Sequence, residues 1–202
     1  MIVIGLTGSI GMGKSTLGRF FAARGAALLD ADALVHRLYR GAAVAPVGAA
    51  FPDAVREGFV DRVALSAEIA RRPEALAEIE AIVHPLVRAE QAAWLGRARA
   101  AGRNFAVLDI PLLLETGGER RVDVVVVASA PADVQRERVL ARSGMTAPKF
   151  EQILARQMPD AEKRRRAHFV VDTSGAMECA DQQAADILRA LAPVAAGRSF
   201  RG

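Results

Sequence analysis

The fold of this 202-residue chain is decided by one stretch near its N-terminus, Gly5-Leu6-Thr7-Gly8-Ser9-Ile10-Gly11-Met12-Gly13-Lys14-Ser15-Thr16. Residues 8–15 of it fit G-x-x-x-x-G-K-[ST], the pattern of a phosphate-binding loop. The apolar run at 2–6 predicts a buried strand before the loop, and Leu17, Phe20 and Phe21 predict a helix after it. A strand, a glycine-rich loop and a helix in this order are the context that the pattern requires.

The chemistry of this loop predicts a nucleotide phosphate as its ligand. Its glycines let the backbone turn successive N–H groups inward, and the positive end of the following helix points into the same place. Lys14 is placed to reach the β- and γ-phosphates, and the Ser15 hydroxyl is placed to ligate Mg²⁺.

The composition is that of an ordinary globular enzyme. The hydrophobic fraction is 51%, the charged fraction 25% and the net charge +4, with a pI near 10.0. A basic chain can bind nucleic acid or act on polyanionic substrates, and we favour the second, with no nucleic acid as partner. Cys179 has no second cysteine to pair with, and neither a signal peptide nor a membrane span is visible, so we expect a cytoplasmic protein that contacts no membrane.

Two aspartates follow the second predicted strand, at 26–30. Asp30 and Asp32 stand where this strand ends and a helix begins. Ligands of parallel sheets bind beyond the carboxyl ends of the strands, which predicts both carboxylates near the phosphate loop. One of them can cap the helix, which leaves the other free to accept a proton, and we favour Asp32 for that role.

Residues 41–102 carry no strand signal and predict a helical insertion between two strands. His84-Pro85 is expected to open a long helix, with proline in its first turn. Arg88 follows His84 by about one turn, so both can face one cleft. A solvated helix start explains the same spacing.

The strand expected at 105–109 ends in Asp109, which has the position of a Walker-B carboxylate that holds Mg²⁺ directly or through water. The apolar stretch 111–115 follows at a loop position and suits the wall of a pocket.

The last part of the chain predicts two further strands and a cationic segment between them. Residues 123–128 and 168–172 are the strands, and a helix is expected at 132–142. Gln135, Arg138 and Arg142 share one face of that helix, either as a solvated surface or as part of a lid that also contains Lys163. Five strands alternating with helices predict a three-layer α/β fold with a mainly parallel sheet.

Assembled in order, these motifs resemble the dephospho-coenzyme A kinase family, whose members have the P-loop NTPase fold. The likeness runs from Gly5 to about Ile187. It rests on the phosphate loop at 5–16, Asp30-Ala31-Asp32, His84-Pro85 with Arg88, residues 109–115, Gln135 with Arg138 and Arg142, the Gln157 region, and residues 172–175.

The resemblance implies transfer of the ATP γ-phosphoryl group to the ribose 3′-hydroxyl of dephospho-CoA, the last step of CoA synthesis, with Mg²⁺ bound to ATP. It makes Asp32, Lys14 and Arg142 the catalytic residues. The implied ATP site consists of Gly8, Gly11, Met12, Gly13, Lys14, Ser15, Thr16, Arg138, Arg142 and Thr173. The implied substrate site consists of Asp30, Asp32, His84, Arg88, Leu112, Leu113 and Glu115. The metal ligands it implies are Ser15 and Asp109.

The resemblance also implies a division of the chain into a nucleotide-binding core (1–40, 103–134 and 167–202), a helical CoA-side insertion (41–102) and a lid (135–166). A monomer or weak homo-oligomer is expected. The chain departs from the family's usual residues at Ser9, Met12, His168 and Thr173. The last two replace an aspartate and an asparagine that lie by the adenine in the family, so the selectivity for the base is in question.

Three alternatives remain at this point. Another P-loop kinase for a small metabolite or a nucleoside monophosphate is the nearest. A regulatory GTPase would need Asn-Lys-x-Asp, but the single asparagine, Asn104, precedes phenylalanine. A nucleic-acid-binding protein would show steeply salt-dependent binding.

Overall fold

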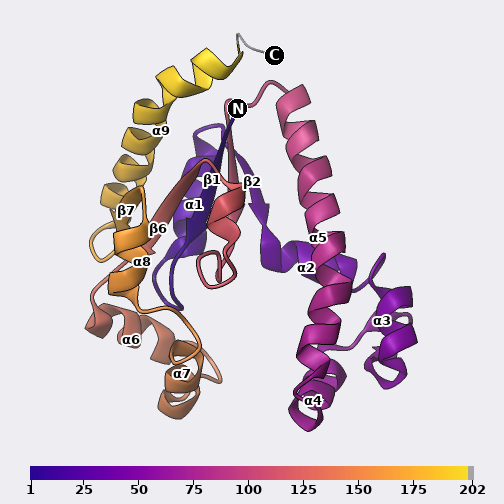
Figure 1. Ribbon diagram of the computed structural model, residues 1–202. Coiled ribbons are helices and arrows are strands. Elements are labelled where there is room, and N and C mark those ends of the chain that lie inside the picture. The colour runs from indigo at the N-terminus through magenta and orange to yellow at the C-terminus, as the bar shows by residue number, and fades with distance from the viewer. Residues whose placement is uncertain (200–202) are drawn as a thin grey trace. The chain divides into compact units, whose positions relative to one another are not determined.

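A computed structural model describes residues 1–199 and contains a five-stranded sheet (Figure 1). Residues 200–202 of the predicted core lie outside the described part. In spatial order the strands are β2 (Ala27–Asp30), β5 (Phe105–Asp109), β1 (Ile2–Thr7), β6 (Val124–Ser129) and β7 (Phe169–Asp172). β1 pairs in parallel with both β5 and β6, and β6 pairs in parallel with β7. The predicted α/β class and five-stranded parallel sheet are confirmed.

The direction in which the sheet is wound reverses at β1. From β1 the chain runs to β2 on one side, and after β5 it crosses over β1 to β6 on the other side. Open parallel sheets bind ligands where the direction of winding reverses, outside the carboxyl ends of the strands. The phosphate loop, which follows Thr7 directly, lies at this point.

Alternation along the strands divides the core between the two faces of the sheet. Ile4, Leu6 and Val126 lie in the larger cluster, which is covered by α1 (Lys14–Ala23) and α9 (Met177–Ser199). Val125 and Val127 point the other way and pack against Leu113 and Leu114 (buried) and against Ile110, Val122, Met158 and Ala167 (half-buried). β-branched residues fill both faces of β6, as expected for a strand buried on both sides.

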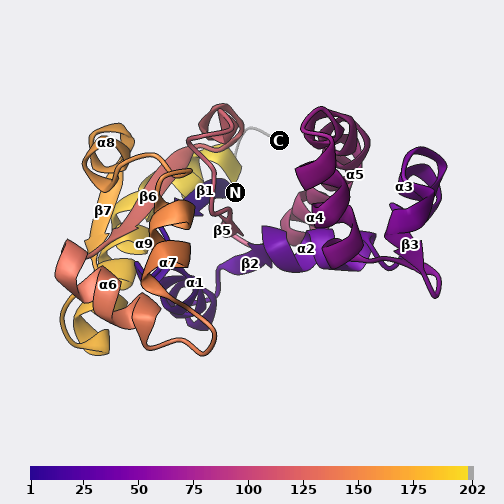
Figure 2. The ribbon, with the colours of Figure 1, turned by 90° about the horizontal axis from the view of Figure 1, so that it is seen from below.

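Three shorter helices follow β6 in the same compact unit: α6 (Ala132–Leu140), α7 (Ala147–Leu154) and α8 (Asp160–Arg166). Figure 2 shows α6 and α7 side by side, and α8 lies against β6. The 3-10 helix η2 (Gly118–Arg121) precedes β6. None of the helices within residues 1–199 has the length and apolar character needed to cross a membrane.

The chain divides into two compact units, and the second comprises Asp30–Arg97. It contains α2 (Ala31–Leu38), α3 (Val44–Ala50), η1 (Pro52–Ala54), β3 (Val55–Arg56), β4 (Phe59–Val60), α4 (Arg62–Arg71) and most of α5 (Ala75–Ala100). This unit begins earlier than the predicted insertion at 41–102, since α2 belongs to it.

Two predictions for the insertion are wrong. No strand was expected there, yet β3 and β4 form an antiparallel hairpin through Gly58, and strands this short leave no periodic signal. The long helix also starts at Ala75 rather than at His84-Pro85, so that Pro85 lies inside it. Pro85 cannot donate a backbone hydrogen bond, but Ile79 and Val83 continue one buried face up to it, and that burial offsets the missing bond.

Leu113→Ala tests the smaller core cluster. Leu113 is 0% exposed, and it packs so closely on β1 that a Cβ added to Gly5 would lie 2.7 Å from its Cδ2 atom. We expect the substitution to lower the free energy of unfolding by about 3 kcal/mol, because it removes buried methyl groups and leaves a cavity. Chemical denaturation measures this loss. Leu112→Ala is the matched control, and a similar loss there would contradict the assignment, because Leu112 is 41% exposed.

Candidate active site

The phosphate loop joins β1 to α1, and glycine is required at both of its ends. A Cβ at Gly8 would lie 2.7 Å from the backbone oxygen of Ala128, so the loop can approach β6 only without a side chain there. Gly13 precedes α1 with a φ of 75° and a ψ of 10°, a left-handed conformation that other residues rarely adopt. The predicted strand, loop and helix are thus present at 2–7, 8–13 and 14–23.

The loop presents an array of backbone donors. Within residues 1–199 the amides of Gly11, Gly13, Lys14 and Ser15 make no hydrogen bond to the protein, whereas Met12 N–H donates to the Ser9 oxygen at 3.1 Å. Gly11 and Gly13 both have positive φ, at 81° and 75°. Such a sequence of conformations directs successive N–H groups into one concavity, which binds an anion together with the N-terminus of α1.

Lys14 and Asp109 form an ion pair at the edge of this concavity. The Lys14 ammonium contacts Asp109 Oδ1, and the two side chains are 15% and 5% exposed. Their strands are neighbours in parallel register, which brings the loop after β1 beside the end of β5. Sequence analysis predicted both residues separately, and the sheet brings them together.

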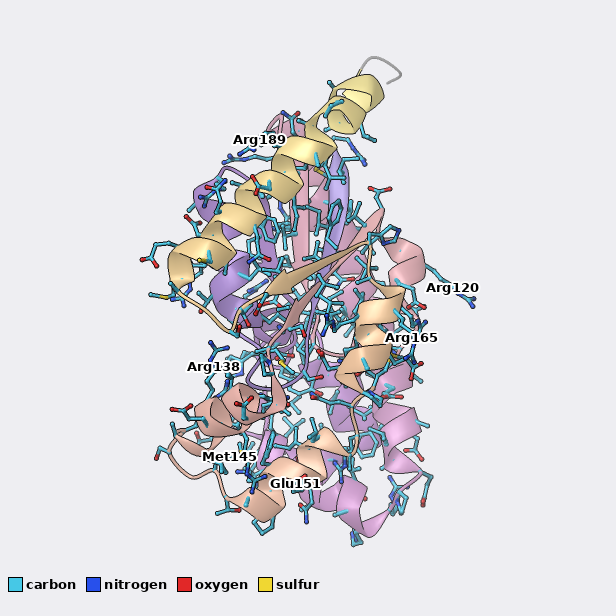
Figure 3. The ribbon with its side chains drawn as sticks, turned by 90° about the vertical axis from the view of Figure 1, so that its left-hand side faces the viewer. Arg120, Arg138, Met145, Glu151, Arg165 and Arg189 are labelled. Atoms are coloured by element: carbon cyan, nitrogen blue, oxygen red, sulfur yellow. The ribbon has the colours of Figure 1, made fainter. Side chains whose placement is uncertain are left out.

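A hollow of about 340 Å³ lies next to the loop, within the same unit. Its lining combines apolar side chains with two arginines and consists of Gly11, Gly13, Thr16, Leu17, Phe20, Arg138, Arg142, Thr173, Gly175, Met177 and Ala180. Arg138 projects from α6 (Figure 3). Arg142 follows the end of that helix and is exposed. The predicted pair of arginines therefore shares a pocket with the phosphate loop.

Thr173 is occupied by bonds to the protein. Its hydroxyl lies 3.0 Å from the Met12 oxygen and 3.1 Å from the Ser129 oxygen, and its own backbone oxygen accepts from Arg138 at 2.6 Å. A hydroxyl has one hydrogen to donate, and here that hydrogen faces these carbonyls. Met12 is anchored as well, because the Ala130 N–H lies 3.1 Å from its sulfur. Met12 and Thr173, two of the four departures from the family pattern, therefore connect the loop to the ends of β6 and β7.

Glu115 and Lys163 form a buried ion pair that the sequence did not reveal. Lys163 is 0% exposed, although it belongs to the run that was predicted to lie in a cationic lid, and its Nζ lies 2.8 Å from Glu115 Oε1. The same oxygen accepts from Met158 N–H at 2.9 Å. Burial acts to raise the pKa of Glu115, but the Lys163 ammonium and the backbone N–H donors together hold it below its ordinary value.

Leu113, which was predicted to line a ligand pocket, is 0% exposed and lies in the smaller core cluster. Which side chains of the stretch 111–115 are exposed and which are buried depends on how the chain turns after β5. Leu112 is the exposed leucine of that stretch, and Leu114 is buried with Leu113.

The remaining predicted residues lie in the second unit. Asp30 caps α2, because its carboxylate accepts from Ala33 N–H at 3.0 Å. Asp32 is exposed in the first turn of the same helix, and its carboxylate is not the cap. His84 and Arg88 are both exposed on α5, one turn apart.

Comparisons with known proteins extend these observations. A model of the dephospho-CoA kinase family matches residues 2–178. A dephospho-CoA kinase of Agrobacterium fabrum is 56% identical over 191 residues, which span 95% of this chain and 98% of that protein. A crystal structure of a Thermus thermophilus protein is 38% identical, has a TM-score of 0.83, and covers 94% of this chain and 96% of its own. A Campylobacter jejuni dephospho-CoA kinase, 21% identical with a TM-score of 0.70 over 97% and 98% of the two chains, has the same fold.

A phosphate loop at the switch point of a parallel sheet, with its lysine beside a strand-end aspartate, defines a P-loop NTPase fold. The family match and the relatives go one step further. The chain belongs to the dephospho-CoA kinase family, and it is an ATP-dependent transferase. The family, the fold and the enzyme class that the sequence predicted are confirmed.

The buried pair generates a prediction about pH. Because the folded-state pKa of Glu115 is depressed, its contribution to stability is present above the ordinary value of 4.5 and is lost as the pH falls through the folded pKa. Glu115→Gln leaves the Lys163 ammonium buried without its partner, so we expect a loss of about 3 kcal/mol at pH 7. That loss should shrink below a pH of about 4.5, as the wild-type carboxylate becomes protonated.

Denaturation of both proteins between acid and neutral pH measures this difference. Glu137→Gln, at an exposed position of α6, is the control. A loss for Glu115→Gln that is the same at every pH would contradict the ion pair.

Proposed function

We propose that the enzyme transfers the γ-phosphoryl group of ATP to the ribose 3′-hydroxyl of dephospho-CoA and that the phosphate loop binds the triphosphate. The observation that carries this proposal is the set of loop amides that have no acceptor within residues 1–199, next to Lys14. Incubation of the purified protein with Mg-ATP and dephospho-CoA tests it: the acceptor should gain the mass of one phosphoryl group.

Lys14 is the charge stabiliser in this proposal. Phosphoryl transfer spreads negative charge over the oxygens of the transferred group, and a fixed cation close to them lowers the barrier. Because Lys14 pairs with Asp109 before ATP binds, its ammonium is already held at the mouth of the loop. The triphosphate then replaces a carboxylate as its partner, which limits the cost of removing the ammonium from water.

Ser15 and Asp109 are the proposed ligands of Mg²⁺. Ser15 is exposed at the start of α1, and Asp109 ends the adjacent strand β5. A hydroxyl and a carboxylate are oxygen ligands of the kind that Mg²⁺ prefers, and the metal commonly completes its shell with phosphates and water. Within residues 1–199 no cluster of three or more His, Cys, Asp or Glu side chains could hold a metal ion. When bound, the ion would neutralise charge on the phosphates.

The hollow beside the loop is the proposed site of the nucleoside part of ATP. Gly11, Gly13 and Thr16 belong to the loop and to α1, so a ligand held there continues from the phosphates. Arg142 is an exposed residue of the lining of this hollow and is proposed to neutralise charge on the transferring group. Arg138, which is bonded to the Thr173 oxygen, is proposed to assist it. Thr173 would contact the base only through its methyl group or backbone, because its hydroxyl is already bonded.

Most of the residues proposed to bind the phosphoryl acceptor lie in the second unit. We propose that Asp32 orients the ribose hydroxyl and accepts its proton, with Asp30 beside it as the cap of α2. His84 and Arg88, exposed one turn apart on α5, are proposed to bind dephospho-CoA, together with Leu112. Glu115 would affect this site indirectly, because its ion pair with Lys163 holds the loop after β5 in place.

Further proposals concern the protein as a whole. We propose that residues 135–166 close as a lid during the reaction. We also propose that the helical insertion, predicted at 41–102, binds the CoA part of the acceptor. We also propose a cytoplasmic enzyme that is a monomer or weak homo-oligomer and has no nucleic acid partner. The paired arginines support the last point, since Arg24, Arg72 and Arg166 are bonded to carboxylates.

Lys14→Met tests the charge stabiliser. We expect turnover to fall by about 10²-fold or more, because one preorganised cation at the transferring group is lost. The steady-state release of ADP measures it. Arg189→Met, which removes an exposed cation of α9, should retain the wild-type rate. Near-normal turnover in Lys14→Met would contradict the role of Lys14.

Asp32→Asn tests the proposed base. We expect turnover to fall by about 10²-fold, because the amide cannot accept the proton, while the unfolding temperature stays within the range of the wild type. Asp133→Asn is the matched control, since Asp133 is exposed at the same position of the first turn of α6. A large loss of stability in Asp32→Asn would show that this carboxylate supports α2 instead.

A further inference from the structure

Two glutamine side chains hold the backbone of Ile10, in the middle of the phosphate loop. Gln157 Oε1 accepts from the Ile10 N–H at 3.0 Å, and Gln135 Nε2 donates to the Ile10 oxygen at 2.7 Å. Gln135 lies on α6 and is 4% exposed, and Gln157 lies between α7 and α8. Both glutamines come from the segment 135–166, far from the loop in the chain.

These bonds define the orientation of both peptide groups that flank Ile10. The N–H of Ile10 belongs to the peptide group before it, and its oxygen belongs to the next one, so each glutamine fixes a different peptide plane. Because the Ile10 N–H is directed to Gln157, it is not part of the amide array that continues at Gly11 and Gly13. Glycines leave this backbone free to rotate, so an external constraint is needed to keep the array directed inward.

Gln135 has a close neighbour on the loop as well. A Cβ at Gly11 would lie 3.0 Å from the backbone oxygen of Gln135 and 3.3 Å from its Cγ atom. The start of α6 therefore packs directly on the glycine whose amide follows Ile10. A short side-chain bond and a packed backbone together limit how far this part of the loop can move.

Gln157 is held in place by the buried ion pair. The next residue, Met158, donates its N–H to Glu115 Oε1 at 2.9 Å, and that oxygen is 2.8 Å from Lys163 Nζ. The Gln157 N–H itself donates to the Leu154 oxygen at 3.0 Å, at the end of α7. The backbone on both sides of Gln157 is thus fixed, so its amide can meet Ile10 with little loss of side-chain entropy.

We propose that Gln135 and Gln157 are positioning residues: they set the shape of the phosphate loop and thereby couple the affinity for the triphosphate to the segment 135–166. They touch the loop backbone and act on ATP through it. Their effect should be confined to phosphate binding, because neither residue lines the hollow proposed for the nucleoside. The inference rests on the proposed triphosphate site at residues 8–15.

Gln157→Met and Gln135→Met, singly and together, test the inference. Methionine keeps the length of the side chain and removes its hydrogen-bonding groups. We expect each single variant to raise the KM for ATP and the Kd for Mg-ADP about tenfold, the effect of losing one hydrogen bond that preorganises the site, while the KM for dephospho-CoA stays within about twofold. The double variant should lose less than the product of the two effects, because both residues orient the same loop.

Gln182→Met is the matched control, since Gln182 is an exposed glutamine of α9 whose amide bonds Asp186 on the same helix. Thermal unfolding of the unliganded variants accompanies the kinetics, which are measured well below each midpoint. An unchanged KM for ATP in both single variants would overturn the inference, and so would equal increases in the KM of both substrates.

Lys14→Met separates this inference from the proposal on which it rests. If wild-type protein and Lys14→Met bind Mg-ADP equally well, the triphosphate site itself is misplaced. If Lys14→Met weakens binding but the glutamine variants do not, only the positioning role fails.

Discussion

The structure depends on a group of backbone amides in the phosphate loop that have no acceptor within residues 1–199. Unpaired N–H groups are costly to bury, and a loop that directs several of them into one place is stable only where solvent or an anion reaches it. The loop meets that requirement at the carboxyl edge of the sheet, at the end of β1, where the direction of winding reverses. Helix α1, Lys14 and Asp109 are arranged around this one set of donors.

Two lysine–carboxylate ion pairs have different positions in this basic chain. Lys14 and Lys163 are both removed from solvent by carboxylates, of Asp109 and Glu115 respectively. The first pair lies where a triphosphate can replace the carboxylate, whereas the second is buried and joins α8 to the loop after β5. Met158 bonds Glu115, and the neighbouring Gln157 bonds Ile10 of the phosphate loop. This series of contacts connects the buried ion pair to the proposed triphosphate site.

Sequence reasoning succeeded where the signal is local and failed where it depends on packing. The strand at 2–7, the loop and the helix from Lys14 were predictable because glycine spacing and apolar periodicity act within a few residues. The hairpin at 55–60 was missed because its strands have two residues each. Pro85 was taken for a helix start, since the burial that carries the helix past it is a tertiary effect. The burial of Leu113 likewise depends on how the chain turns after β5.

By itself, the sequence determined the kind of ligand and the family, because a phosphate loop requires particular residues at fixed spacing and several separated motifs occur in order. Only the tertiary structure decided which charges are available for chemistry. Lys163 and Arg142 look alike in a list of cations, yet one is enclosed with Glu115 and the other is exposed beside the loop. The physical reason is that a pattern of residues records their order along the chain, whereas burial and ion pairing depend on distances between strands and helices that are remote in it.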